Sequence, residues 1–182
     1  MALHIAFEKS TDTMVKKLVK AVCGPYVHTE LILTQKETDK TQRIHTGYST
    51  FLHETFTRIF QKEFWYDDES HDFLNVVVSD DELHRISQAC EACAESKVPY
   101  NAMDMVLSQL PMRRPTERDL VNSKTLFCSQ AVVLILRFGL DKSHPLQATL
   151  RTVNSRTISP TRLFEILKPY CPRRSKQQTI DA

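Results

Sequence analysis

The sequence predicts an α+β domain in which a small antiparallel sheet of about five strands packs against one central helix. Segments of alternating and β-branched residues recur in the N-terminal half, and a strongly apolar segment follows at residues 128–139. With 182 residues, an apolar fraction of 41% and only three glycines, the chain has the size and composition of one globular domain. We assign residues 1–171 to this domain and expect residues 172–182, which are polar and charged, to form a disordered tail.

The expected strands all lie in the first 78 residues. After the first strand, the capping residues at 10–13 predict a helix over 14–22, which Gly24 and Pro25 end. A polar turn at 35–39 joins the next two strands into a hairpin. The strands are expected at residues 3–7, 26–34, 42–48, 51–60 and 73–78.

The expected helices dominate the rest of the chain. Ser79 and Glu82 form a capping box that begins a helix ending near Ser96. A helix over 102–109 and the apolar helix beginning at Cys128 follow, the second ending near Gly139. Residues 141–157 are polar and predict a loop, and a last helix opens at Ser159 and runs to about residue 167.

Charge and hydropathy exclude several function classes. A net charge of +2 is too small to predict nucleic-acid binding. The arginines at 113, 114 and 118 are interpreted as a solvated loop, with contact to an anionic surface as the alternative. The N-terminal residues lack the basic start and apolar core of a signal peptide. The longest apolar run, residues 131–136, is far below the roughly 20 residues of a transmembrane helix. We therefore expect no membrane segment and an intracellular, reducing location.

The five cysteines fit free thiols better than a disulfide framework, because their number is odd and the chain can build a full core. Cys90 and Cys93 form a C-x-x-C pair, but no second pair completes a zinc site. Together with Ile86 they follow helical spacing, which indicates the buried face of a helix. We expect neither a metal nor a cofactor.

Cys128 and His28 are the candidate catalytic pair. Cys128 begins a helix, where unpaired N–H groups and the helix dipole stabilise a thiolate. His28 lies on a predicted strand and supplies a general base. The alternative is that Cys128 is a small buried hydrophobic residue and His28 a hydrogen-bonded histidine at a strand edge.

A third polar group should orient the imidazole, and two residues compete for that role. His45 lies on the returning strand of the hairpin, and Glu30 lies two residues from His28 on the same strand face. We favour His45, since cross-strand pairs come closer, at roughly 5 Å, than same-strand neighbours at nearly 7 Å. The backbone N–H of Cys128 is the natural first oxyanion donor, and Tyr26 is either a pocket residue or part of the core.

Five short stretches occur in an order that resembles circularly permuted papain-like proteins, in which the histidine precedes the cysteine. They are Tyr-Val-His-Thr-Glu-Leu at 26–31, Arg-Ile-His-Thr-Gly-Tyr at 43–48, Val-Pro-Tyr-Asn at 98–101, Phe-Cys-Ser-Gln at 127–130 and Ile-Ser-Pro-Thr-Arg-Leu at 158–163. This group includes permuted NlpC-type hydrolases, the lecithin-retinol acyltransferase group, YiiX-like bacterial proteins and a poxvirus virulence family. The resemblance supports the choice of His45 and adds Tyr100 as a pocket candidate, with a core tyrosine as the alternative.

The resemblance implies a thiol hydrolase or acyltransferase that forms an acyl-enzyme on Cys128. Its substrate would be an amide, ester or thioester in a peptide, isopeptide or lipid. A poxvirus-like member would act in the host cell. The alternative is a catalytically inactive papain-like module that binds or regulates a partner, because a shared fold does not settle function.

Overall fold

The computed structural model describes residues 2–36, 43–51, 54–60, 69–95 and 126–171. These residues form an α+β fold with an antiparallel sheet, as predicted. The strands lie in the order β4-β3-β2-β1-β5, so that the first strand is enclosed by the second and the last. Their bounds are β1 (Ala2–Glu8), β2 (His28–Lys36), β3 (Arg43–Phe51), β4 (Glu54–Phe60) and β5 (His71–Val76).

The side chains of β1 and β2 alternate between the two faces of the sheet. Leu3, Ile5 and Phe7 of β1 belong to the main hydrophobic cluster of buried residues. Leu31 and Leu33 of β2 belong to the same cluster. The antiparallel register pairs Ile5 with Leu31 and Leu3 with Leu33, so these residues share one face. Ala6 and Ile32 form a separate buried cluster on the other face.

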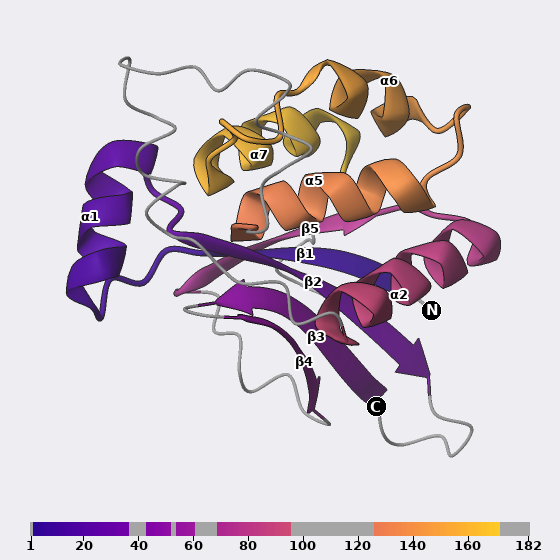
Figure 1. Ribbon diagram of the computed structural model, residues 1–182, viewed down its shortest axis with the longest axis horizontal. Coiled ribbons are helices and arrows are strands. Elements are labelled where there is room, and N and C mark those ends of the chain that lie inside the picture. Colours follow the sequence, from indigo (N-terminus) through magenta and orange to yellow (C-terminus); the bar gives the residue numbers. More distant parts are fainter. Residues whose placement is uncertain (1, 37–42, 52–53, 61–68, 96–125, 172–182) are drawn as a thin grey trace.

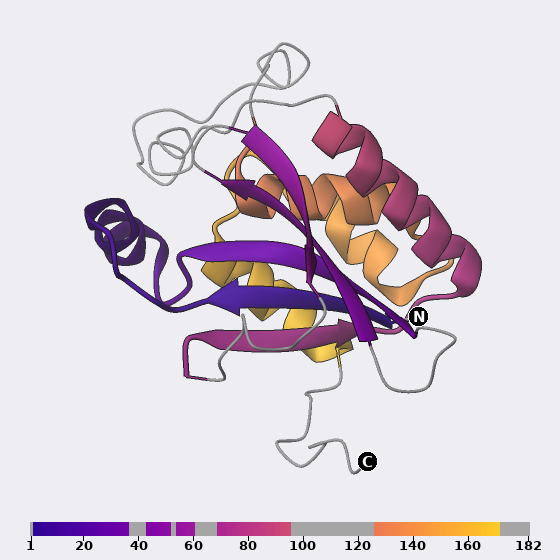
Figure 2. The same ribbon diagram turned by 90° about the horizontal axis from the view of Figure 1, so that it is seen from below.

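Helices cover the face that carries the main cluster. Figure 1 shows α5, α6 and α7 layered on this side, with α2 beside α5 and α1 at one end of the sheet. Figure 2 shows the same layers from below, with the strands in front of α5 and α7. The helices are α1 (Met14–Cys23), α2 (Asp80–Glu95), α5 (Cys128–Gly139), α6 (Pro145–Thr152) and α7 (Pro160–Leu167), and a 3-10 turn, Lys168–Tyr170, follows the last of them.

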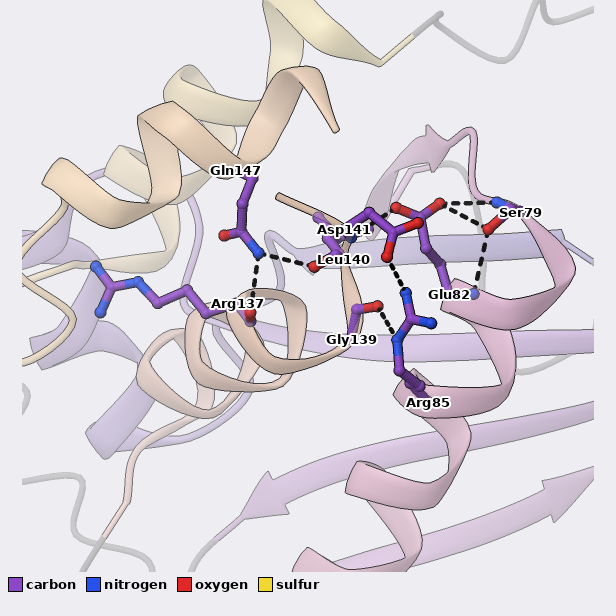
Figure 3. A network of polar contacts seen from close by, with 8 residues as sticks. All are labelled: Ser79, Glu82, Arg85, Arg137, Gly139, Leu140, Asp141 and Gln147. Carbon is purple, nitrogen blue, oxygen red and sulfur yellow. Dashed lines mark hydrogen bonds and ion pairs between the residues drawn. The ribbon is translucent and has the colours of Figure 1, made fainter. Parts of the chain in front are cut away.

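The predicted capping box at the start of α2 forms, and it also joins α2 to the end of α5 (Figure 3). Glu82 accepts hydrogen bonds from the backbone N–H of Ser79 and from that of Asp141, each at 2.8 Å. Burial disfavours the charged carboxylate, but these bonds outweigh it and lower the pKa of Glu82. Arg85 donates to the carbonyl of Gly139 at 3.0 Å.

α2 and α5 are in close contact at Gly139. A Cβ atom at this position would lie 2.2 Å from the Cγ1 of Ile86 in α2, so only glycine allows this approach. The C-terminal end of α5 thus packs closely against α2. This packing helps to set the orientation of α5, and therefore the position of its first residue, Cys128.

The prediction of a loop over 141–157 was wrong, because α6 lies within it. His144 caps this helix by accepting from the N–H of Leu146, and Pro145 fits the first helical position. Leu146 and Leu150 are buried one turn apart, and this short apolar stripe stabilises the helix by packing against the core of the domain.

The last strand also ends earlier than predicted, at Val76. The predicted helix over 102–109, the arginines at 113, 114 and 118 and the tail lie outside the described residues.

Cys90 and Cys93 lie on the inner side of α2, as predicted. Cys90 is buried in the main cluster and Cys93 packs against it. Burial raises the pKa of both thiols, as is typical of unreactive structural cysteines. Among the helices in the described parts of the chain, none is long and apolar enough to cross a bilayer.

Candidate active site

Cys128 is the first residue of α5, at a helix start without a side-chain cap. Phe127 precedes it in extended conformation and makes no capping hydrogen bond. The sulfur of Cys128 accepts hydrogen bonds from two backbone N–H groups, those of Ser129 and Thr29. One donor belongs to the first turn of the helix and the other to β2. Such donors stabilise a thiolate more than a thiol.

His28 is hydrogen-bonded to Cys128 through its side chain, so the structure brings the two predicted residues together across 100 positions of sequence. Burial is the largest influence on each group and opposes its charged form. Mutual attraction and the shared hydrogen bond outweigh it, so the pKa of Cys128 is lowered and that of His28 is raised. The arrangement favours a thiolate–imidazolium pair.

The first residue of α5, Cys128, contacts the beginning of β2, where β2 is not paired with β3. Pairing of β2 with β1 begins at His28, whereas pairing of β2 with β3 extends from Leu31 to Lys36. The first three residues of β2 therefore lie outside the second ladder. The N–H of Thr29, in this region, donates to the thiol.

Contacts from the start of α7 and from Ile158, just before it, support both halves of the pair. Ser129 donates its hydroxyl hydrogen bond to the carbonyl of Ile158, which anchors the first turn of α5. Thr161 accepts from the N–H of Tyr26 at 3.1 Å, just before His28. Gly24 has a φ of 94°, and a Cβ there would lie 2.9 Å from the Oγ1 of Thr161. The tight turn after α1 thus sets where β2 begins.

Two carboxylates lie near the imidazole, and the sequence indicated only one of them. Glu30 is buried, follows His28 on the same strand face, and its charge helps to raise the pKa of His28. Glu8 stands directly opposite His28 in the β1–β2 register and acts in the same direction. Lys16 of α1 binds Glu8 at 2.7 Å. This contact links α1 to the strand that faces the histidine.

The prediction of His45 as the third residue does not fit the register. His45 pairs with Thr34, six residues along β2 from His28. At about 3.3 Å per residue the two histidines are separated by roughly 20 Å along the strand direction. The prediction assumed that the two histidines lie opposite one another, but the position opposite His28 is taken by Glu8 of β1. The structure therefore favours Glu30 and Glu8 over His45.

Tyr26 is a core residue, so its predicted alternative role as a pocket residue is not supported. Its ring packs against Phe7 and Phe164, with centroids 5.5 and 4.6 Å away. Its hydroxyl donates to Asp72 of β5. Both its apolar and its polar parts are occupied inside the fold. The other pocket candidate, Tyr100, lies outside the described residues.

The surroundings of Cys128 are apolar and closed. It belongs to a buried cluster with Val19 and Cys23 of α1, Val27 and Phe127. Cys128 is 1% exposed and His28 is 8% exposed. Burial and then the negative charge of Cys128 raise the pKa of Cys23 to about 11, so the neighbouring thiol stays protonated. A reactant must displace part of this cover to reach the sulfur.

Thr29 is a further site residue that sequence reasoning missed. Its N–H donates to Cys128, yet its own hydroxyl is buried without a hydrogen-bond partner in the part of the chain that the structure describes. Threonine is common in strands, so nothing in the sequence distinguished it from any other strand residue. The hydroxyl is therefore a buried polar group that the described residues leave unsatisfied.

Comparison of the chain with protein-family models, curated proteins and solved structures gave no match.

Proposed function

We propose that this protein is a cysteine-dependent hydrolase or acyltransferase that acts on an amide, ester or thioester bond. The observation that carries the proposal is the hydrogen-bonded pair of Cys128 and His28, in which the cysteine pKa is lowered and the histidine pKa is raised. A low-pKa thiol beside an imidazole is typical of a nucleophile with its general base. The other cysteines in the described residues lack this combination, since burial raises the pKa of each of their thiols.

In the proposed reaction the thiolate of Cys128 attacks the carbonyl carbon and its electron pair forms the new C–S bond. The imidazolium of His28 then protonates the leaving group, and a thioester remains on the enzyme. Water or a second acceptor, deprotonated by His28, attacks the thioester and releases Cys128. The N–H of Cys128 at the start of α5 is the candidate donor to the oxyanion.

Glu30 and Glu8 take the role first assigned to His45 in this proposal. Both charges favour the protonated imidazole, and both residues lie on the strand face of His28. They act as positioning residues, because they reach the reaction only through the ring. The short motifs and the antiparallel sheet with its cysteine-bearing helix support a permuted papain-like fold.

The second candidate is a catalytically inactive papain-like module that binds or regulates a partner. It is favoured by the closure of the site, since Cys128 is only 1% exposed. The two functions differ in a measurable product. An enzyme must gain the mass of an acyl group on Cys128 whenever formation of the thioester is faster than its breakdown.

Intact-mass spectrometry with a panel of lipid esters, acyl-peptides and isopeptides tests the proposal. We expect an acyl adduct that is lost in Cys128→Ala and retained in Cys171→Ala, the matched control at a buried thiol outside the site. The substrate that leaves the adduct identifies the bond class. Absence of both adduct and turnover across the panel, with Cys128 unreactive toward small alkylating agents, would support the binding module instead.

A further inference from the structure

Arg156 is a buried arginine whose charge has no partner among the described residues. It is 8% exposed, and its Nε and Nη2 atoms are both buried without a hydrogen bond. Its backbone N–H, by contrast, is paired with Asn154 at 3.1 Å. An arginine keeps its proton in proteins, so burial cannot be relieved by loss of the charge. An uncompensated buried charge is unusual and needs an explanation.

Arg137 shows how this chain pairs a comparable arginine. Its Nε donates to the carbonyl of Leu150 at 2.8 Å, and its Nη2 donates to the carbonyls of Leu150 and Val153. That guanidinium joins α5 to the end of α6. Arg156 is more deeply buried and has no equivalent carbonyls on its Nε and Nη2 atoms. A purely structural role would be expected to supply them.

The two unpaired atoms of Arg156 form one edge of the guanidinium. Nε and Nη2 point their hydrogens in the same direction, which is the geometry that binds two oxygens of a carboxylate or phosphate side by side. A single carbonyl would satisfy only one of them. The unpaired edge thus matches a planar or tetrahedral oxyanion.

Arg156 lies in the segment between α6 and α7, and this segment is bonded to the candidate active site. The carbonyl of Ile158 accepts from Ser129, the residue after Cys128. Ser159 donates to the carbonyl of Cys23 at 3.5 Å. Asn154, Thr157 and Ile158 line an open cleft between α6 and α7, but Arg156 is not among its lining residues and is buried instead.

We propose that Arg156 binds the anionic group, a carboxylate or a phosphate, of the molecule on which Cys128 acts. The role in substrate selection rests on the proposed function, whereas the anion site itself does not. A substrate anion would supply the two missing acceptors and place the adjoining acyl group near the first turn of α5. Arg156 is then a specificity residue that selects acidic acyl compounds over neutral ones.

The test measures anion binding directly, without turnover. Inorganic phosphate or acetate is added to the full-length protein at constant ionic strength, and the side-chain 15Nε–1Hε NMR signals of the arginines are followed. The Arg156 signal is identified by its absence in Arg156→Met, a change that keeps much of the side-chain volume. We expect this signal to shift and saturate with one or both anions. Phosphate and acetate arms distinguish phosphorylated from carboxylated ligands.

Thermal denaturation provides the second readout. Anion binding should raise the Tm of the parent, and the apparent Kd should weaken at least about tenfold in Arg156→Met. Arg151→Met, which removes the same charge from an exposed position on α6, should behave like the parent. In anion-free buffer Arg156→Met should be at least as stable as the parent, because it removes an unpaired buried charge.

Two results would overturn the proposal. One is an Arg156 signal that neither anion moves. The other is an Arg156→Met protein that is less stable than the parent in anion-free buffer, which would indicate a structural arginine. Failure of the proposed enzyme is recognised separately, because an unreactive Cys128 leaves the NMR titration unchanged. A moving Arg156 signal with an unreactive Cys128 would retain the anion site and reject the acyl chemistry.

Discussion

The reactivity of Cys128 relative to Cys23 and Cys171 tests the site most directly, since ionisation and access predict opposite orders. Cys128 is the least exposed of the three, at 1% against 7% for Cys23 and 4% for Cys171. Access alone would make it the slowest to react. Burial raises the pKa of Cys171 to about 11, and burial together with the charge of Cys128 does the same for Cys23. The pKa of Cys128 lies below its ordinary value of 9.0.

The pKa directions give the difference in rate that ionisation alone would produce. At pH 7 a thiol of pKa 11 is about one ten-thousandth thiolate, and one of pKa 9 about one hundredth, so Cys128 has an advantage of at least roughly 100-fold. A less basic thiolate is intrinsically less nucleophilic, which offsets about tenfold over two pKa units. Ionisation alone therefore gives Cys128 a net advantage of about tenfold, and its lower exposure acts against that advantage.

The assay is iodoacetamide labelling of the folded protein at several pH values, with each cysteine quantified by peptide mass spectrometry. Cys128 should react first at pH 7, with a pH midpoint below 9.0. His28→Ala should slow it, because loss of the imidazolium leaves burial to raise the thiol pKa. The matched control is His84→Ala, at an exposed position of α2, which should leave the rate unchanged.

Equal or faster labelling of Cys23 or Cys171 would refute the reasoning. A Cys128 midpoint above 9.0 would do the same, since it would mean that burial outweighs His28 and the two backbone N–H donors.

Three further predictions concern the support of the site. Glu30→Gln should lower turnover and the pKa of His28, measured by NMR, more than His45→Ala does, because the register places His45 far from the base; the opposite ranking would restore His45. Gly139→Ala should lower the Tm by several degrees, since overpacking against α2 costs about 1–3 kcal/mol and exceeds the gain of about 1 kcal/mol in helix propensity; an unchanged or higher Tm would contradict this. Glu82→Gln should destabilise the protein by about 1–3 kcal/mol at pH 7 in urea unfolding, because one backbone N–H loses its acceptor. The pKa of Glu82 is lowered on folding, so its contribution is present above the ordinary value of 4.5 and lost as the pH falls through the folded value; a Glu82→Gln deficit that persists at lower pH would refute the assignment.

The sequence by itself determined the features that depend on local patterns. The apolar helix beginning at Cys128, the capping box of Ser79 and Glu82, and the inner face of α2 with Cys90 follow from helical periodicity and end signals. These signals lie within one or two turns, so nearby residues suffice to read them. The antiparallel sheet was predictable in the same way, from alternation within each strand.

Only the tertiary structure decided which residues surround His28. The choice of His45 assumed a hairpin register, whereas the register observed pairs His45 with Thr34 and places Glu8 of the first strand opposite His28. Strand pairing joins segments far apart in the chain, and a shift of register changes every cross-strand neighbour without altering any local pattern. The pairing of Cys128 with His28 was predicted from a thiol at a helix start, a histidine on a strand and the order of the short motifs, whereas their hydrogen bond required the fold.

The unpaired polar groups could not be found from sequence at all. Thr29 and Arg156 are ordinary residues in ordinary local contexts, and their importance lies in what they lack once buried. Burial and hydrogen-bond satisfaction are properties of the packed molecule, because they depend on every segment that closes over the side chain. Local periodicity specifies which elements form, and packing alone determines which polar atoms are left for a ligand.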